Sequence, residues 1–374
     1  MKIIHVIPNL RKGGAERIVL NICTEIQAQN EHDILLITFQ PDNAYTFLTE
    51  NLNWKVVPSD VIPSITGKAE INVSELQSTI DDFQPDVIHA HLFKTMMVLS
   101  QITNNSAKLF LHFHDNMFQL ERFSWSKLFQ KSMWTNLYEK QLIYRVYNKR
   151  NVTAIAISDD TLRYANKVLP NKIEVIKLLN AIDRERFFSE AKRERSNRIV
   201  MIGSLVEKKN QRLAIETIDE LRTRGIHLSL DLVGDGILRQ DLEDHVQTKD
   251  LIERVTFHGA VNYPEQILEK ALIYIHTSKV EAFGLVLVEA MSAGLPVVCT
   301  DGGGNRDLIL EGKNGFMVNE FSTKLLADKV EYLIKHPGKR VVMGKNAQEF
   351  SRKFDISSYT KKLIELYKRS QRSA

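Results

Sequence analysis

Short apolar runs rich in Val, Ile and Leu recur along the chain, with helix-length segments between them. In the first half they occupy residues 3–7, 34–39, 87–91, 109–113 and 154–157, and a second series occupies 198–202, 229–233, 255–258, 273–277 and 297–300. This alternation is typical of a parallel, doubly wound α/β sheet. It occurs twice in 374 residues, a length too great for one average core. We therefore predict an α/β protein with two Rossmann-like domains.

The highly charged segment 183–197 has no strand pattern and separates the two series. We interpret it as the interdomain linker, with a boundary near residue 190. The sequence then predicts an N-terminal domain over residues 1–190 and a C-terminal domain over residues 191–353.

Composition narrows the class of protein. Hydrophobic residues make up 43% and charged residues 26%, and the net charge is +4, which favours an ordinary compact fold over a nucleic-acid-binding protein. Cys23 and Cys299 lie far apart without metal-type spacing. The chain opens on a strand-length run that lacks the features of a signal peptide, and no apolar stretch approaches the roughly 18 residues of a membrane span. We expect a cytoplasmic location.

The segment from Ile273 to Val298 predicts a strand, a loop, a helix and a second strand. Its loop carries Glu281, and Glu289 falls within the helix. The helix start leaves the backbone N–H groups of Phe283, Gly284 and Leu285 free, and such groups suit a phosphate. The alternative interpretation is a surface helix with a solvated glutamate.

Two glutamates separated by seven residues resemble the motif of family 4 (group 1) retaining glycosyltransferases of the GT-B fold, of the bacterial polysaccharide-assembly type. The resemblance covers most of the chain. It implies that Glu281 lies near the donor sugar and that Glu289 holds the ribose. It also implies two parallel sheets facing a cleft, with the acceptor on the first domain, the nucleotide sugar on the second, and a final helix at 354–370 that packs back on the first.

The segment that opens the second half resembles the family's Gly-Arg-Leu-x-x-x-Lys motif. Gly203 matches its glycine and Lys209 its lysine, which implies that Lys209 binds the diphosphate as a catalytic cation. The usual arginine is Ser204 here, so one expected phosphate contact is absent, and Lys208 or Arg306 is a candidate replacement.

Gly234 and His258 follow the next two strands and match family positions, so we expect them to shape the pocket for the nucleotide base. Three consecutive glycines at 302–304 match the family's glycine-rich loop, and the alternative for them is a flexible connection.

In the first half, Gly13 and Gly14 lie in a loop between a strand and a helix that resembles the family's Gly-Gly-Ala-Glu-Arg. We expect Gly14 near the donor phosphate and Gly13 toward the acceptor. His114 resembles the family histidine that contacts the donor sugar, so we assign it a catalytic role, and His89 and His91 would flank the acceptor. The alternatives are packed sheet histidines or a zinc site, but no carboxylate or cysteine completes a ligand set, and we expect no metal.

The segment 122–150 contains seven Lys or Arg residues and one acid, with interleaved aromatic side chains. Such segments suit an anionic membrane surface or a polyprenyl-diphosphate acceptor, so Arg122 and Lys127 are acceptor candidates. The alternative is an ordinary helix that covers the sheet with a solvated basic face.

The sequence therefore predicts a retaining, metal-independent transferase without a cofactor. Its donor would be a UDP-hexose or UDP-N-acetylhexosamine, with UDP preferred over GDP by family frequency alone. The acceptor would be a glycan or a polyprenyl-diphosphate-linked sugar in capsule, O-antigen or other surface polysaccharide synthesis, with peripheral contact to the membrane and no nucleic acid. Two alternatives stay open: a GT-B-fold epimerase, and a non-catalytic protein that binds nucleotide sugars.

Overall fold

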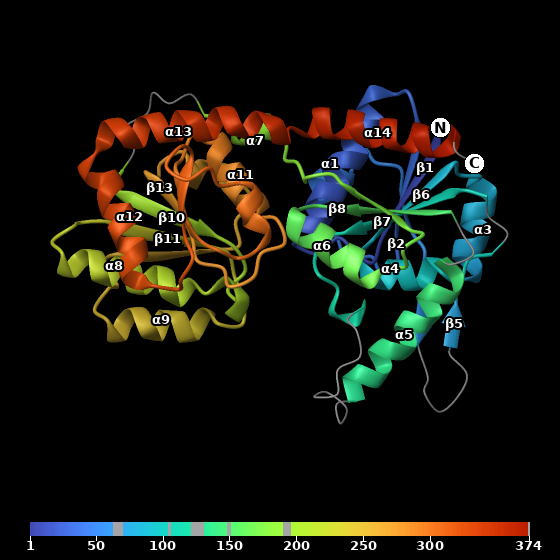
Figure 1. Cartoon of the computed structure of the whole chain (residues 1–374), viewed down its shortest axis with the longest axis horizontal. Helices are drawn as coiled ribbons and strands as arrows, with labels where there is room; N and C mark the ends of the chain where they lie inside the picture. Colours follow the sequence, from blue (N-terminus) through green and yellow to red (C-terminus); the bar gives the residue numbers. More distant parts are fainter. Residues whose placement is uncertain (63–69, 104–105, 121–130, 148–150, 190–195, 373–374) are drawn as a thin grey trace. The chain divides into compact units, whose positions relative to one another are not determined.

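A computed structural model describes the chain except residues 63–69, 104–105, 121–130, 148–150, 190–195 and 373–374. It contains two compact units (Figure 1). Unit 1 comprises Met1–Ala181 and Ile356–Ala374, and unit 2 comprises Ile182–Asp355. Each unit is built on its own parallel sheet, so the predicted α/β class with two Rossmann-like halves is confirmed.

The sheet of unit 1 has the strand order β3-β2-β1-β6-β7-β8-β9, and all its strands are parallel. The order reverses between β1 and β6, and the carboxyl ends of strands at such a reversal are where open α/β sheets bind ligands. The strands are β1 (Lys2–Ile7), β2 (Asp33–Thr38), β3 (Trp54–Val56), β6 (Val87–His91), β7 (Lys108–Phe113), β8 (Val152–Ala156) and β9 (Glu174–Lys177), with a separate hairpin of β4 (Asp60–Ile62) and β5 (Glu70–Asn72).

Helices cover both faces of this sheet, because alternate residues of each buried strand point to opposite sides. Ile4 and Val6 of β1 pack with α3, α4, α5 and α6, whereas Ile3 and Ile7 pack with α1 and α14. The helices are α1 (Gly14–Gln29), α2 (Thr46–Thr49), α3 (Ser74–Phe83), α4 (Leu92–Leu99), α5 (Lys131–Tyr147), α6 (Asp159–Val168) and α14 (Ile356–Arg372), with a 3₁₀ turn η1 (Phe118–Leu120).

Helix α14 returns to unit 1 at the end of the chain and lies beside α1 (Figure 1). Tyr359, Leu363 and Tyr367 recur every four residues, so they share one face of the helix, and all three are buried. The hydroxyl of Tyr367 thereby reaches the histidine-bearing face of the sheet.

The sheet of unit 2 has the order β12-β11-β10-β13-β14-β15, again all parallel. The reversal here lies between β10 and β13. The strands are β10 (Arg198–Ile202), β11 (Ser229–Val233), β12 (Val255–Gly259), β13 (Ile273–His276), β14 (Val297–Thr300) and β15 (Gly315–Val318).

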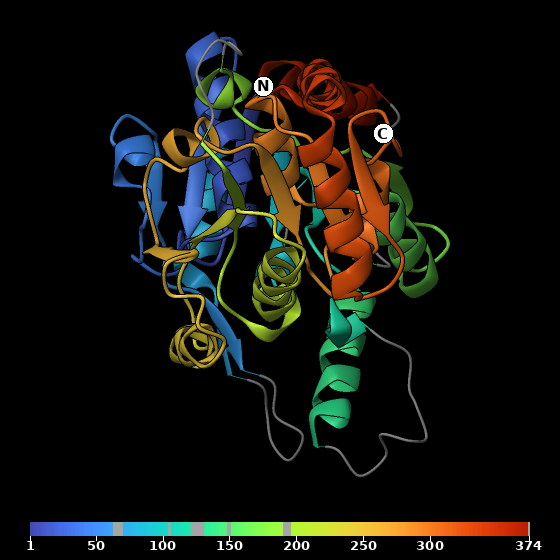
Figure 2. The same cartoon turned by 90° about the vertical axis from the view of Figure 1, so that its left-hand side faces the viewer.

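Helices flank this sheet on both sides (Figure 2). One face packs on α8, α9 and α12, and α11 contacts β13 and β14. The helical elements are α7 (Arg184–Phe187), η3 (Glu207–Lys209), α8 (Gln211–Thr223), α9 (Arg239–Thr248), α10 (Glu265–Leu268), α11 (Leu285–Ser292), η4 (Gly304–Asp307), α12 (Thr323–Lys335), α13 (Pro337–Ser351) and η5 (Arg352–Phe354).

The structure differs from the expected linker over residues 183–197. The two units divide between Ala181 and Ile182, because the following residues already contact unit 2. Phe187 of α7 is buried, the Arg186 guanidinium pairs with Glu265, and the Ser292 hydroxyl donates to the Arg184 carbonyl. Residues 183–189 are therefore part of unit 2, and the charged side chain of Arg186 makes contacts within that unit.

Within the part of the chain that the structure describes, no helix combines the length and the apolar character needed to cross a membrane.

Candidate active site

Lys209 and Glu281 meet at the carboxyl edge of the second sheet, where the strand order reverses. Lys209 ends the 3₁₀ turn η3 that follows β10, and Glu281 lies in the loop that follows β13. The Lys209 Nζ atom lies 2.5 Å from Glu281 Oε2, and both side chains are largely buried. Two predicted site residues that are far apart in sequence are thus joined at the place where such sheets bind ligands.

His276 is a third member of this group, and sequence reasoning missed it. It is the last residue of β13 and fully buried, and its Nε2 atom lies 3.0 Å from Glu281 Oε2. Burial lowers its pKa, so the ring is neutral, and its proton must be on Nε2 to donate to a carboxylate. Its position at the end of a strand was the available signal.

Glu281 is ionised despite its burial. Burial would raise the pKa of this carboxyl, but the hydrogen bond from His276 and the charge of Lys209 outweigh it and lower the pKa to about 2. Both contacts use Oε2, and Oε1 has no hydrogen-bond partner among the described residues. A carboxylate oxygen is therefore left to accept from ligand hydroxyls.

The triglycine segment 302–304 fixes the backbone of Glu281. The Glu281 N–H donates to the Gly302 carbonyl at 2.7 Å, and the Gly304 N–H donates to the Glu281 carbonyl at 2.8 Å. A Cβ atom on Gly304 would lie 1.9 Å from the Ala282 carbonyl oxygen. The alternative of a flexible connection is therefore wrong, since this loop needs glycine for close backbone packing.

Helix α11 begins at Leu285 after Gly284, which adopts φ +97°, a conformation that favours glycine. The Phe283 side chain is buried against the Phe354 ring, so only its backbone is available to a ligand. Glu289 lies on α11 and is partly buried. Burial raises the pKa of the Tyr274 hydroxyl, and the negative charges of Glu289 and Glu281 raise it further.

The other predicted donor residues of unit 2 line the same strand ends. The Gly203 N–H donates to the Val233 carbonyl at 2.9 Å, and the Gly234 N–H donates to the Gly259 carbonyl at 2.8 Å. Ser204 is exposed, and its carbonyl accepts from Gln211 at 2.8 Å.

The two candidates for replacing the missing arginine differ in their surroundings. Arg306 pairs with both carboxylate oxygens of Asp301, at 2.9 and 2.8 Å from its Nε atom. Lys208 is exposed in the turn beside Lys209. Because Arg306 is already paired with a carboxylate, Lys208 is the candidate that the geometry favours.

His258 is held by a buried carboxylate that sequence reasoning missed. Its Nε2 atom lies 2.6 Å from Asp231 Oδ1, and the Arg198 guanidinium contacts both oxygens of Asp231 at 2.6 Å. Burial opposes ionisation of Asp231, but these two partners lower its pKa. A single aspartate inside an otherwise apolar strand was the signal for this pair.

In unit 1 the glycine loop precedes α1, which begins at Gly14. The Gly13 N–H donates to the Tyr45 hydroxyl at 3.0 Å, and that hydroxyl lies 3.0 Å from the Gly13 carbonyl. The Glu16 carboxylate lies directly against Gly13. The positive end of the α1 dipole therefore already carries a carboxylate from its own first turn.

The predicted histidines of unit 1 lie in one buried cluster, which also contains His5. His114 Nε2 lies 2.9 Å from His91 Nδ1, and His91 Nε2 lies 3.0 Å from His5 Nδ1. His89 is fully buried and bonds to the Tyr367 hydroxyl. His114 follows the last residue of β7, at the carboxyl edge of the sheet, and is 8% exposed.

Arg122 and Lys127 lie outside the described residues. Of the basic segment, α5 is described, and its Trp134 side chain is 45% exposed whereas Ile143 and Tyr147 are buried.

Two family patterns match the chain and together span most of it. The pattern described as "Glycosyltransferase Family 4" matches residues 12–186, and "Glycosyl transferases group 1" matches residues 183–350. An uncharacterized glycosyltransferase of Methanocaldococcus jannaschii is 26% identical over 205 residues, which are 53% of this chain and 56% of that protein.

A second relative is the N-acetylgalactosamine-N,N'-diacetylbacillosaminyl-diphospho-undecaprenol 4-alpha-N-acetylgalactosaminyltransferase of Campylobacter jejuni. It is 31% identical over 185 residues, which are 46% of this chain and 49% of that protein. The chain thus matches about half the length of these relatives.

A solved structure, HepE of Anabaena in complex with UDP, has a similar fold. It superposes with a TM-score of 0.80 at 22% identity and covers 99% of this chain and 100% of that chain.

Proposed function

The chain belongs to the group 1 glycosyltransferases of family 4, which have the GT-B fold, and from this premise we propose that it transfers a sugar from a UDP-sugar to a glycan or lipid-linked acceptor with retention of configuration and without a metal. The observation that carries the proposal is the Lys209–Glu281–His276 group at the strand reversal of unit 2.

Lys209 acts on the diphosphate. Its ammonium group has three N–H donors, and the Glu281 bond uses one of them. The remaining donors and the positive charge stabilise the negative charge that develops on the leaving UDP, more strongly in the transition state than before it. The amides at the start of α11, beside Gly284, supply further donors to the phosphate.

Glu281 acts on the sugar. Its carboxylate is ionised and fixed through Oε2, so Oε1 can accept hydrogen bonds from sugar hydroxyls. Glu289 on the next helix accepts from the ribose hydroxyls. His114 of unit 1 contacts the donor sugar, in line with the resemblance.

The transfer step needs no protein nucleophile. The bond from the anomeric carbon to the β-phosphate oxygen breaks, and the acceptor oxygen bonds to the same face of that carbon. The acceptor hydroxyl proton passes to the departing phosphate oxygen, and UDP leaves. Positioning and charge stabilisation supply the catalysis.

The acceptor is a polyprenyl-diphosphate-linked glycan or another growing surface polysaccharide. Support comes from the name of the C. jejuni relative, whose acceptor is a diphospho-undecaprenol sugar. Peripheral contact with an anionic membrane fits such an acceptor, and the exposed Trp134 on α5 is compatible with it.

A panel of nucleotide sugars tests the proposal, because a ligand that binds only the folded state raises its unfolding temperature. We expect UDP and one UDP-sugar to raise it without added metal, and UDP to be released when an acceptor is supplied. Conversion of the donor to an epimer in the absence of acceptor would instead identify an epimerase. Binding without UDP release from any acceptor would identify a sensor.

A further inference from the structure

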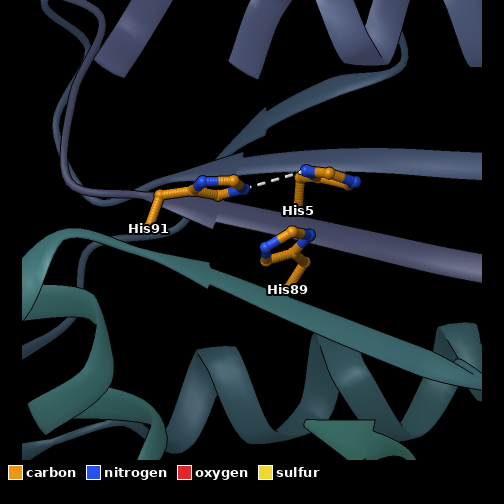
Figure 3. A group of neighbouring side chains, drawn as sticks. All are labelled: His5, His89 and His91. Atoms are coloured by element: carbon orange, nitrogen blue, oxygen red, sulfur yellow. Dashed lines mark hydrogen bonds between the residues drawn. The ribbon is translucent and has the colours of Figure 1, made fainter. Parts of the chain in front are cut away.

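Five histidines gather on one face of the sheet in unit 1, and Figure 3 shows three of them. Burial lowers the pKa of each ring, so all five are neutral at neutral pH. The rings contact one another closely; the His112 and His114 centroids, for example, are 4.1 Å apart. The cluster comprises His5 on β1, His89 and His91 on β6, His112 on β7, and His114 immediately after β7.

Four of these rings and one tyrosine hydroxyl form a continuous hydrogen-bonded chain. From the strand end inward, the contacts are His114 Nε2 to His91 Nδ1 at 2.9 Å, His91 Nε2 to His5 Nδ1 at 3.0 Å, His5 Nε2 to the Tyr367 hydroxyl at 3.4 Å, and that hydroxyl to His89 Nδ1 at 2.5 Å. The two ends, His114 Nδ1 and His89 Nε2, are buried and have no partner among the described residues.

This connectivity ties the tautomers together. A neutral imidazole carries one N–H, and its other nitrogen can only accept. If His91 donates through Nδ1 to His114, its Nε2 must accept from His5, which must in turn accept from Tyr367. The four histidines are therefore all Nδ1–H or all Nε2–H. A mixed set leaves two donors or two acceptors facing each other, or it makes the Tyr367 oxygen accept from both His5 and His89 and leaves the buried O–H proton without an acceptor.

The two ends of the chain decide between these sets. The Nε2–H set places an unpartnered N–H at His89, which is fully buried, and buried N–H groups without a partner are rarer than buried acceptors without one. The Nδ1–H set leaves the unpartnered N–H at His114 Nδ1 instead; this atom is also buried, but its residue is 8% exposed and lies at the carboxyl edge of the sheet, where open α/β sheets bind ligands.

We propose that His91, His5, Tyr367 and His89 are positioning residues that hold His114 as the Nδ1–H tautomer, so that it presents an N–H donor to a hydroxyl oxygen of a bound sugar. The identity of the ligand rests on the proposed function. The shared tautomer follows from the hydrogen bonds among these side chains and does not depend on the proposed function.

A transition-metal ion is the competing explanation for this cluster. The ligand nitrogens of His5, His89 and His91 lie within 4.8 Å of one another, and those of His91, His112 and His114 do as well. Both groups consist only of neutral imidazoles, so neither supplies an anionic ligand to offset a buried dication. The hydrogen-bonded chain needs no added charge and is favoured.

The test is ¹⁵N NMR of the full chain with labelled histidine, which distinguishes protonated, unprotonated and metal-bound ring nitrogens. We expect Nδ1–H at His114, His91, His5 and His89, with less than one metal ion per ten chains by elemental analysis. A Nε2–H tautomer at any of the four, or one bound metal ion per chain, would overturn the proposal.

Tyr367→Phe removes the hydroxyl that links His5 to His89, so His5, His91 and His114, which stay linked to one another, should populate both the shared Nδ1–H form and the shared Nε2–H form. Tyr359→Phe is the matched control: its hydroxyl is also buried on α14 but has no hydrogen-bond partner among the described residues. The control should leave the spectrum unchanged. Unchanged tautomers in Tyr367→Phe would contradict the hydrogen-bonded chain of histidines. If that variant does not fold, the wild-type spectrum alone tests whether the four histidines share the Nδ1–H tautomer.

The readouts separate the two proposals. Uniform Nδ1–H tautomers in a protein that turns over no nucleotide sugar would refute the proposed function but would still support the hydrogen-bonded chain of histidines. Turnover by a protein whose four histidines do not share one tautomer would refute only the hydrogen-bonded chain of histidines.

Discussion

The Lys209 Nζ atom lies 2.5 Å from Glu281 Oε2, although 72 residues separate the two in sequence. The pair brings the turn after β10 to the loop after β13, and its charges are largely shielded from water. The Lys209 charge helps to keep Glu281 ionised at a position where a charged ligand would bind, which makes this pair the centre of the proposed site.

Lys209→Ala should lower the turnover rate about 100-fold or more, because one cation that stabilises the leaving group is lost. The rate constant should fall more than the apparent affinity, since the charge acts mainly in the transition state. Steady-state kinetics with a UDP-sugar measure both.

Lys279→Ala is the control for this change. Lys279 also follows β13 and pairs with a glutamate, Glu207, but that pair is exposed. It should retain near-normal turnover. Equal losses in the two variants would argue against a specific role for Lys209.

Gly304→Ala should destabilise unit 2 by about 1–3 kcal/mol and weaken UDP binding, because the new Cβ forces the Glu281 loop to shift. Gly338→Ala, in α13, should be neutral or slightly stabilising, since no atom lies within 4 Å of its Cβ and alanine favours helix. Urea unfolding and calorimetric UDP titration compare the two. Normal UDP affinity in a folded Gly304→Ala protein would refute the role of this loop.

Ser204→Arg restores the arginine that the family places after Gly203. A guanidinium can bind phosphate oxygens bidentately, so we expect UDP affinity to rise roughly tenfold, with a steeper dependence on salt. Ser204→Met, of similar length and without charge, should not change affinity. Identical affinities in both variants would show that Lys208 or another group already fills the role.

Acid should destabilise unit 1. Burial, reinforced for His89, His91 and His112 by neighbouring histidines, lowers the pKa of all five rings, to about 3 for His5 and His114. Unfolded histidines protonate near pH 6.5, so stability is fully present above that pH. It falls as the pH drops further, by up to about 1.4 kcal/mol per pH unit for each ring.

Urea unfolding between pH 8 and pH 5, followed by hydrogen exchange in α1 and α14, measures this loss. His112→Phe is a suitable variant, because neither ring nitrogen of His112 has a partner among the described residues. This variant should reduce the pH dependence of the free energy of unfolding by an amount that corresponds to about one bound proton. A stability that does not change between pH 7 and pH 5 would contradict the burial of these rings as neutral groups.

The sequence predicted ten strands of the two large sheets and their division into two series, because buried parallel strands are continuous apolar runs. It missed β3, β9 and β15, short strands at sheet edges with weaker apolar patterns. Edge strands are fixed by pairing with a neighbour, and a local pattern carries little information about pairing.

The residues of the candidate site also divide into those that a local sequence pattern predicts and those that it does not. Lys209 and Glu281 were found because their motifs are local in sequence. His5 and Asp231 act through partners on other strands, and the pairing register brings them together. His276 contacts Glu281 five residues later, in the loop that follows β13, and only the loop conformation brings the two side chains together. Tyr367 reaches the histidine cluster from the far end of the chain, and nothing in its local sequence indicates that contact.

The most direct test is the stereochemistry of transfer. The purified chain is incubated in EDTA with the UDP-sugar that stabilises it most and with polyprenyl-diphosphate-linked glycans, and NMR reads the anomeric configuration of the new linkage. We predict UDP release and a product with the same anomeric configuration as the donor. An inverted product, a strict requirement for a metal, or no transfer from any bound donor would contradict the account.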